Sequence, residues 1–158
     1  MQRRGRLRLH DYDYRTAGSY FVTACAHDRE CLFGRVADDR VDLSPIGVIV
    51  ELAAGGMGEF HPGVALDSFV VMPNHVHAIL YLDRGRRPPP VPAVVGAFKA
   101  RASRRADRAL WQRGYHDRII RDEHELSALR EYIETNPLRG AVDRENPERR
   151  RMTDERAG

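Results

Sequence analysis

The chain has 158 residues, of which 42% are apolar and 31% charged, and its formal net charge is +3. This length suits a single domain that buries about two-thirds or more of its unfolded surface. No apolar stretch reaches the ~20 residues that a membrane span needs, and no apolar segment follows the arginine-rich N-terminus. We therefore expect a cytoplasmic protein without a membrane partner. Two cysteines, Cys25 and Cys31, are too few and too irregularly spaced for a disulfide scaffold or a zinc knuckle.

The basic residues are clustered, and Lys99 is the single lysine among the 26 basic residues. The arginine bias by itself can reflect a GC-rich genome, but basic patches on an arm and on a helix indicate a polyanionic partner. A merely solvated basic face remains the alternative. The residues expected to contact a polyanion are Arg3, Arg4 and Arg6 in the N-terminal arm, and Lys99, Arg101, Arg104 and Arg105 in a later helix.

In chain order, residues 1–18 read as an arm, and the aromatic and β-branched residues of Ser19–Cys25 predict a first strand. After a polar loop, Ser44 is a predicted N-cap with Pro45 at the first helical position. The helix then has an expected apolar stripe of Ile46, Ile49, Val50 and Ala53, and Gly55-Gly56 weakens its second half.

A hairpin comes next. Residues 65–72 form a predicted strand, Pro73-Asn74 is a turn signal, and an apolar strand follows from His75 to Leu82. Side chains two apart in a strand point to the same face, so His75 and His77 leave one face together. Two neutral imidazoles on a strand make a good pair of metal ligands and lack at least one further ligand.

The proline-rich stretch 86–92 predicts a stiff connection, and a helix is expected from about Ala93 to Ala106. Its inward residues are expected to be Val94, Val95, Phe98 and Ala102. A short strand is predicted within 111–120. In the last helix Asp122 and Glu125 form a capping-box-like pair, and the helix is expected to end at Pro137. Its predicted buried stripe is Leu126, Leu129 and Ile133.

The element order is β-α-β-β-α-β followed by one more helix. We therefore predict an α+β fold of the ferredoxin-like (split βαβ) type, an antiparallel sheet with helices on one face plus a C-terminal catalytic helix. The predicted domain spans 1–143, and the mixed-charge segment 144–158 is an expected disordered tail. Many functions share this fold, so the site residues have to decide the function.

Two polar residues on the last helix complete a candidate site. Tyr132 and Asn136 are four residues apart, so on a helix they share one face. A tyrosine is a candidate nucleophile, although its ordinary pKa near ~10 means that it needs activation. An asparagine carbonyl is a hard oxygen ligand that suits Mg²⁺ or Mn²⁺ better than zinc. If the helix packs across the histidine face, these residues give a three-ligand metal site beside a nucleophile.

These residues lie in motifs that resemble the REP-associated tyrosine transposases, in the HUH single-tyrosine transposase superfamily of bacterial insertion sequences. The resemblance runs from about residue 9 to 143. Its motifs are Tyr12–Tyr14 with Tyr20–Thr23, Leu43–Gly47, Leu66–Ile79, Gly96–Lys99, Trp111–Tyr115, Ile119–Glu123 and Tyr132–Pro137.

The resemblance implies a metal-dependent endonuclease and strand transferase that nicks and rejoins single-stranded, hairpin-forming DNA through a 5′-phosphotyrosine link. By the same resemblance Tyr132 matches the nucleophile, His75 and His77 the histidine pair, and Asn136 the third ligand of Mg²⁺ or Mn²⁺. The implied partners are palindromic repeats, and the protein is expected to be a monomer or a homodimer. Arg113 and Tyr115 are further expected DNA contacts.

Three alternatives remain beside this reading. Tyr115 is a rival nucleophile, although it lacks a polar ligand one helical turn away. A histidine-triad nucleotide hydrolase needs a third histidine where this chain has Ile79. A domesticated or non-catalytic ferredoxin-like nucleic-acid-binding protein needs neither a metal nor a nucleophile. It is disfavoured because Tyr132 and its three partner residues are all present.

Overall fold

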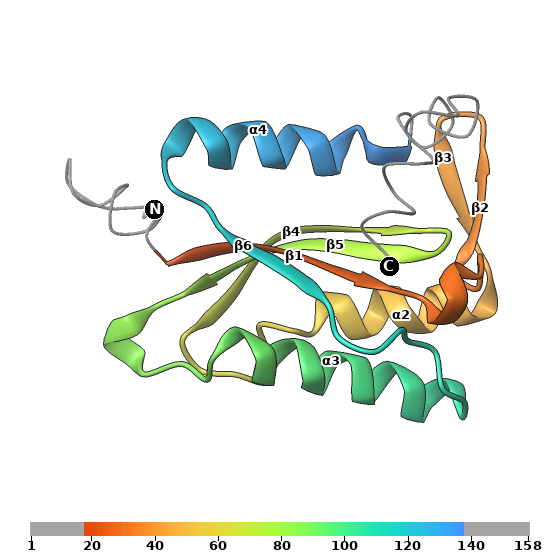
Figure 1. Cartoon of the computed structure of the whole chain (residues 1–158), viewed down its shortest axis with the longest axis horizontal. Helices are drawn as coiled ribbons and strands as arrows, with labels where there is room; N and C mark the ends of the chain where they lie inside the picture. The colour runs from red at the N-terminus through yellow and green to blue at the C-terminus, as the bar shows by residue number, and fades with distance from the viewer. Residues whose placement is uncertain (1–17, 138–158) are drawn as a thin grey trace.

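The structure is a computed structural model that describes residues 18–137 of the chain. Its centre is a four-stranded sheet in the order β4-β5-β1-β6, with neighbouring strands antiparallel (Figure 1). The strands are β1 Ser19–Cys25, β4 Val64–Met72, β5 His75–Leu82 and β6 His116–Ile119. Because β5 lies between β1 and β4, this is the split βαβ arrangement, and the predicted ferredoxin-like fold is confirmed.

The prediction of a polar loop after β1 is only partly correct. It contains the short 3-10 helix η1 (His27–Arg29) and a hairpin of β2 (Gly34–Ala37) and β3 (Arg40–Leu43). The two residues between these strands are Asp38 and Asp39, and Asp38 has a left-handed φ of 60°. Asp is one of the few residues that tolerate this geometry in a two-residue hairpin turn. This turn signal was present in the sequence, but the flanking strands are only four residues long.

Helix α2 (Pro45–Gly55) begins as predicted, with the Ser44 hydroxyl accepting a hydrogen bond from the Gly47 backbone N–H at 2.9 Å. Its buried face is shifted from the expected stripe. Gly47, Val50, Ala53 and Ala54 are buried, whereas the expected Ile46 and Ile49 are only partly buried. Gly47 lies so close to the Phe33 carbonyl that a Cβ there would clash with it. The expected stripe misses this contact because it depends on the chain preceding β2.

Helix α3 (Val91–Ala106) starts two residues earlier than predicted, because Pro92 fits within its first turn. The short helix η2 (Arg84–Arg86) precedes the predicted stiff connection and overlaps it only at Arg86. The predicted inward residues Val94, Val95, Phe98 and Ala102 are all buried.

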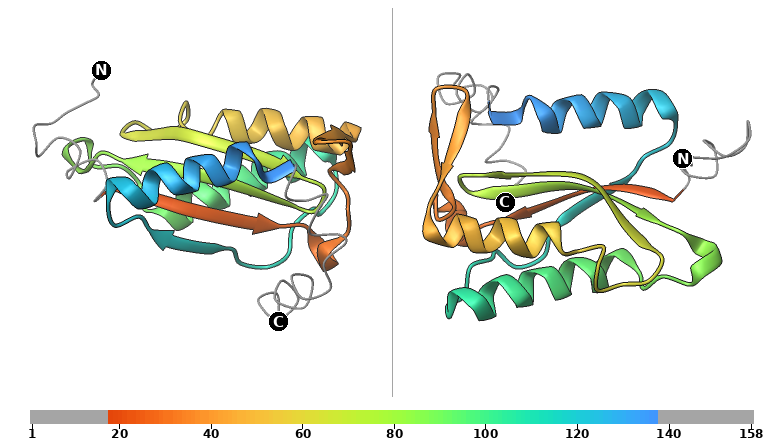
Figure 2. Two further views of the ribbon diagram at one scale, coloured as in Figure 1. Left: turned by 90° about the horizontal axis from the view of Figure 1, so that it is seen from above. Right: turned by 180° about the vertical axis from the view of Figure 1, so that it is seen from behind.

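The helices lie on both faces of the sheet (Figure 1). Helices α2 and α3 cover one face and bury the main core with alternate residues of β1 and β5. Helix α4 (Glu123–Glu134) lies on the other face, where Leu126, Leu129 and Ile133 pack with Ile79 and Ile120. Seen from above, α4 runs over β4 and β5, and β1 and β6 lie beside it (Figure 2).

Three predictions concern residues outside the described range. The arm, apart from Gly18, the domain boundary at residue 143 and the tail 144–158 all lie there, as do Arg3, Arg4 and Arg6. Within residues 18–137, no helix is long and apolar enough to cross a membrane.

Candidate functional site

Strand β5 presents its two histidines to the face that carries α4. Val76, Ala78 and Leu80 belong to the core beneath α2 and α3, whereas Ile79 packs beneath α4. Strand alternation therefore turns His75 and His77 toward α4. Their ring centroids are 4.6 Å apart, so the two imidazoles are immediate neighbours.

A chain of hydrogen bonds determines which nitrogen of His75 is free. The Asn74 side-chain amide donates to the Arg29 carbonyl at 3.3 Å, which leaves its Oδ1 as the atom that faces His75. This oxygen can only accept, so His75 Nδ1, at 2.7 Å, carries the proton. The lone pair of His75 then lies on Nε2. Such an outer partner fixes a histidine for metal binding in many proteins.

His77 is held in a comparable way from β1. Thr23 is its cross-strand partner, and the threonine Oγ1 lies 2.8 Å from His77 Nδ1. The Phe21 ring stacks on the imidazole with centroids 5.1 Å apart. With Nδ1 occupied by Thr23, Nε2 is the nitrogen available to a ligand.

Burial keeps both imidazoles neutral near pH 7. Desolvation, together with the nearby positive charge of Arg29, lowers the pKa of His75 from 6.5 to about 4. Desolvation also holds the pKa of His77 well below the ordinary value, with the neighbouring His75 adding to the effect. Only a neutral imidazole can bind a metal, so the pair is ready to do so without losing a proton.

Helix α4 brings Tyr132 to this pair. The helix begins as predicted, with the Asp122 carboxylate accepting from the Glu125 backbone N–H at 2.8 Å. The Glu125 carboxylate in turn accepts from the Arg121 N–H at 2.9 Å. The Tyr132 ring centroid lies 5.5 Å from that of His77 and 6.2 Å from that of Phe21. The candidate nucleophile and the histidine pair are therefore side by side.

Asn136 is placed differently from the expectation. Helix α4 ends at Glu134 with Thr135 as its C-cap, and the backbone of Asn136 and Pro137 is helical again after this turn, so Asn136 lies just beyond α4 rather than within it. Asn136 is nevertheless buried, with 4% of its surface exposed. The next residue, Pro137, lines a hollow together with Val70, the cross-strand partner of His77. Asn136 thus lies at the histidine end of the sheet.

The residues present fit a metal ion of the kind expected. No group of three His, Cys, Asp or Glu side chains within residues 18–137 is placed to bind a metal, so among these residues a further ligand to the histidine pair would be of another type. The buried Nδ2 of Asn136 has no hydrogen-bond partner in that range. The oxygen and nitrogen of an amide are assigned from their surroundings, and the amide turned by 180° would place its oxygen, a hard metal ligand, where the unpartnered Nδ2 stands.

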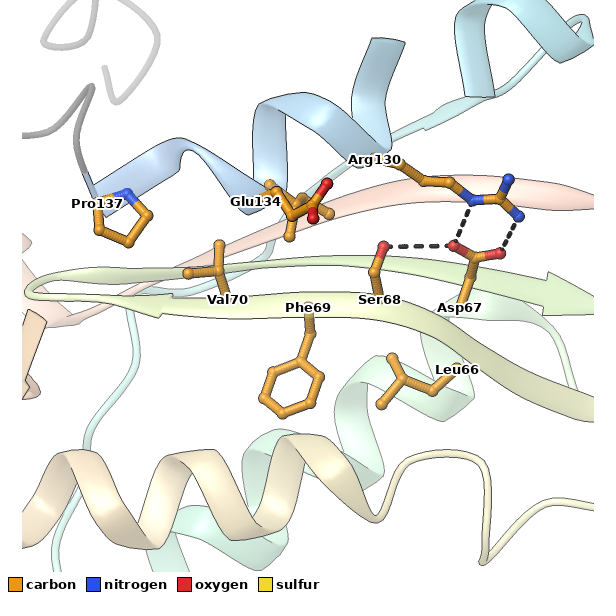
Figure 3. Close-up of a pocket in the computed structure, with 9 residues that line it drawn as sticks. Leu66, Asp67, Ser68, Phe69, Val70, Arg130, Glu134 and Pro137 are labelled. Carbon is orange, nitrogen blue, oxygen red and sulfur yellow. Dashed lines mark hydrogen bonds and ion pairs between the residues drawn. The ribbon is translucent and has the colours of Figure 1, made fainter. Parts of the chain in front are cut away.

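An ion pair clamps α4 onto β4. Arg130 donates from Nε to Asp67 Oδ1 at 2.9 Å and from its terminal nitrogen to Oδ2, in a hollow of about 730 Å³ (Figure 3). A β-bulge between Leu66 and Ser68 turns both Asp67 and Ser68 toward α4, whereas Leu66 and Phe69 point toward α2. The bulge therefore creates the anchor for the helix that carries Tyr132.

The expected basic residues of α3 lie on the opposite face of the sheet from Tyr132 (Figure 1). The Lys99 ammonium donates to the carbonyls of Gln112 and Gly114 at 3.0 and 2.7 Å, so it fastens the segment before β6. The Arg101 guanidinium lies 4.3 Å over the Phe60 ring. Arg104, Arg105 and Arg113 are exposed. The structure does not bring the basic residues of α3 to the histidine pair.

Tyr115 is unsuited to be the nucleophile. Its hydroxyl donates to the Asp117 carboxylate at 3.0 Å, and the ring packs against the core on the α2 and α3 side. Burial, helped by this hydrogen bond, raises the pKa of Tyr115 to about 12, so it forms a phenolate less readily than usual. Its expected contact with DNA stays a prediction.

The sequence alone did not identify two residues that hold the histidine pair, Thr23 and Asn74. Thr23 becomes visible only once the register of β1 against β5 is known. Asn74 was read as a turn residue, although its position directly before His75 was a usable signal.

Comparisons with known proteins support the fold. No protein-family model matches the chain. An uncharacterized protein of Haemophilus influenzae is 33% identical in an alignment 156 positions long that covers 84% of this chain and 87% of that protein. Among solved structures, a REP-associated tyrosine transposase bound to a REP hairpin has a TM-score of 0.62 and 18% identity, over 78% of this chain and 68% of that one. A candidate transposase of Deinococcus radiodurans has a TM-score of 0.50 and 19% identity, over 73% of this chain and 88% of that one. The fold is shared with both, in agreement with the resemblance of the sequence motifs.

Proposed function

We propose a function from two premises: the chain belongs to the same family as the Haemophilus influenzae protein, and it has the fold of a REP-associated tyrosine transposase. The protein is a transposase-like endonuclease and strand transferase for single-stranded, hairpin-forming DNA. The observation that carries the proposal is the packing of Tyr132 beside His77, with the neutral His75 ring 4.6 Å from that of His77.

In the proposed reaction, Tyr132 Oη attacks the phosphorus of a DNA phosphodiester. A bond forms between this oxygen and phosphorus, and the bond from phosphorus to the 3′-oxygen breaks. The phenolic proton passes to solvent, and the departing 3′-oxygen takes up a proton to become a 3′-hydroxyl. The 5′-phosphotyrosine link keeps the energy of the broken bond, so a second 3′-hydroxyl can reverse the step and join two strands without a nucleotide cofactor.

His75, His77 and Asn136 would hold a Mg²⁺ or Mn²⁺ ion. The ion would supply Lewis-acid polarisation of the phosphate oxygens. The chain itself provides the orientation: Thr23 and Asn74 fix the two imidazoles, and α4 holds the phenol beside them. Phe21 and the apolar stripe of α4 keep water from this side of the imidazoles.

A gel assay tests the proposal. The substrates are single-stranded oligonucleotides of the palindromes that flank the gene, labelled at the 3′ end because the protein stays on the downstream fragment. With Mn²⁺, wild type and Tyr115→Phe should give a labelled protein adduct, and Tyr132→Phe should give none. An adduct formed by Tyr132→Phe would refute the nucleophile. Wild-type cleavage unchanged by EDTA would refute the metal.

A further inference from the structure

Arg29 is fastened to the turn that precedes His75. The segment after β1 is tied to the β4–β5 turn by hydrogen bonds from the Ala26 N–H to the Asn74 carbonyl at 2.8 Å, and from the Phe33 N–H to the Pro73 carbonyl at 2.9 Å. Between these two, the Asn74 amide donates to the Arg29 carbonyl at 3.3 Å. Arg29 is therefore held at the end of β5 where the histidine pair lies.

The backbone at this point is strained. Asp28 and Arg29 have φ values of 52° and 55°, in the left-handed region that residues other than glycine rarely adopt. Each such residue costs on the order of 1 kcal/mol or more, and strain of this kind gathers at binding and catalytic sites. Hydrogen bonds to the β4–β5 turn, together with one from the Arg29 N–H to the Ala26 carbonyl, hold the backbone in this conformation.

Within residues 18–137, the Arg29 side chain has an unsatisfied hydrogen-bond donor and no ion-pair partner. It is half-buried, and its buried Nε has no hydrogen-bond partner among residues 18–137. No carboxylate in that range is paired with it, and the carboxylate of the adjacent Asp28 lies 3.2 Å from His27 Nε2 instead. Burial lowers the pKa of His75 and raises that of its cross-strand partner Cys25, and the positive charge of Arg29 adds to the first effect and opposes the second. The guanidinium is therefore close to His75, at the histidine end of β5.

We propose that Arg29 is a catalytic residue that binds a non-bridging oxygen of the phosphodiester attacked by Tyr132. The identity of this phosphate rests on the function proposed above. A guanidinium remains charged at all working pH values and offers a planar fork of donors that matches a phosphate. Negative charge builds on the non-bridging oxygens during the attack, and a fixed donor there typically contributes about 10²- to 10³-fold in rate.

The effect of Arg29 on metal binding distinguishes a phosphate-binding role from a purely structural one. A metal ion on the histidine pair and the Arg29 guanidinium are like charges, so without a phosphate between them they repel each other. Removing the charge of Arg29 should therefore leave Mn²⁺ binding unchanged or tighten it. A side chain that only supported His75 would weaken Mn²⁺ binding on removal.

The first test is single-turnover adduct formation by wild type, Arg29→Gln, Arg29→Lys and the control Arg40→Gln, whose arginine is exposed on β3. We expect Arg29→Gln to be about 10²-fold slower, Arg29→Lys to be intermediate and Arg40→Gln to equal wild type. On DNA with a neutral methylphosphonate at the scissile position, wild type and Arg29→Gln should react within about threefold of each other. An adduct rate for Arg29→Gln near that of wild type on ordinary DNA, or an undiminished gap on the methylphosphonate, would overturn the proposal.

The second test needs no DNA sequence. Mn²⁺ is titrated into wild type and Arg29→Gln with and without dimethyl phosphate, a diester with a single charge. The diester should tighten Mn²⁺ binding by wild type and not by Arg29→Gln. Equal behaviour of the two proteins, or weaker Mn²⁺ binding by Arg29→Gln alone, would refute an anion site at Arg29. If wild type forms no adduct in the first test but the diester effect is present, the proposed transposase chemistry fails and the anion site at Arg29 stands.

Discussion

The ion pair between Arg130 and Asp67 should control how firmly α4 holds Tyr132 over the histidine pair. Replacing Arg130 by Met keeps most of the apolar stem and removes both charged hydrogen bonds. The Asp67 side chain is only 9% exposed and that of Arg130 is 38% exposed, so the pair is neither fully buried nor free in solvent. Exposed pairs contribute about 0.2–1 kcal/mol, and losing one partner of a buried pair costs about 3–5 kcal/mol.

Between these limits we expect a coupling energy of about 2 kcal/mol in a double-mutant cycle of Arg130→Met and Asp67→Asn. For a chain of this size, that corresponds to a fall of roughly 4–8 °C in Tm for Arg130→Met. Thermal and urea unfolding followed by circular dichroism would measure both quantities. Because Tyr132 is two residues from Arg130, the rate of adduct formation should also fall, by about tenfold.

A matched control is available in the β2–β3 hairpin. Arg40 and Asp42 form a pair whose side chains are 73% and 40% exposed, at 3.3 Å. A cycle of Arg40→Met and Asp42→Asn should give a coupling energy of no more than about 0.5 kcal/mol. A coupling for Arg130 and Asp67 as small as this control would refute the view that the ion pair clamps α4.

Further changes test the fold and the histidine pair. Gly47→Ala should destabilise the protein by well over ~1 kcal/mol, because the new Cβ would clash with the Phe33 carbonyl. Gly96→Ala is the control: the space around Gly96 in α3 is open, so this change should be neutral or stabilise the protein by up to ~1 kcal/mol. Equal Tm values for the two variants would contradict this expectation. Asn74→Ala should weaken Mn²⁺ binding about 10- to 100-fold in calorimetry, since His75 loses the acceptor that fixes its tautomer, and unchanged affinity would disprove that role. In the metal-free protein the pKa of His75 is about 4 when folded, against 6.5 ordinarily, so below pH 6.5 the unfolded chain binds a proton that the folded chain does not. The free energy of unfolding should thus fall as the pH falls from about 6.5 toward 4, by up to about 1.4 kcal/mol per pH unit, and less steeply in His75→Gln.

Much of the fold could be predicted from local patterns. Strand alternation and turn residues predicted β1 and β5 with their observed bounds, and capping side chains predicted the starts of α2 and α4. The β2–β3 hairpin was missed because two short strands carry little periodicity. The bulge at Asp67 could not be foreseen either, since it arises from the pairing of β4 with β5.

The candidate site could likewise be predicted only in part. The sequence predicted His75, His77 and Tyr132 as neighbours, and the structure brings their rings together. The contacts of Thr23 and Arg29 depend on register and on a strained turn, which no residue pattern encodes. The place of Asn136 beyond the end of α4 depends on where the helix stops. Its role as a metal ligand stays a prediction.

The central claim is that Tyr132 becomes covalently attached to DNA. The most direct measurement is mass spectrometry of the protein after reaction with the oligonucleotide and digestion by nuclease and trypsin. The account predicts a nucleotide 5′-phosphate on Tyr132, in the tryptic peptide that begins at Glu131. A nucleotide on Tyr115 or on any other residue would contradict the account.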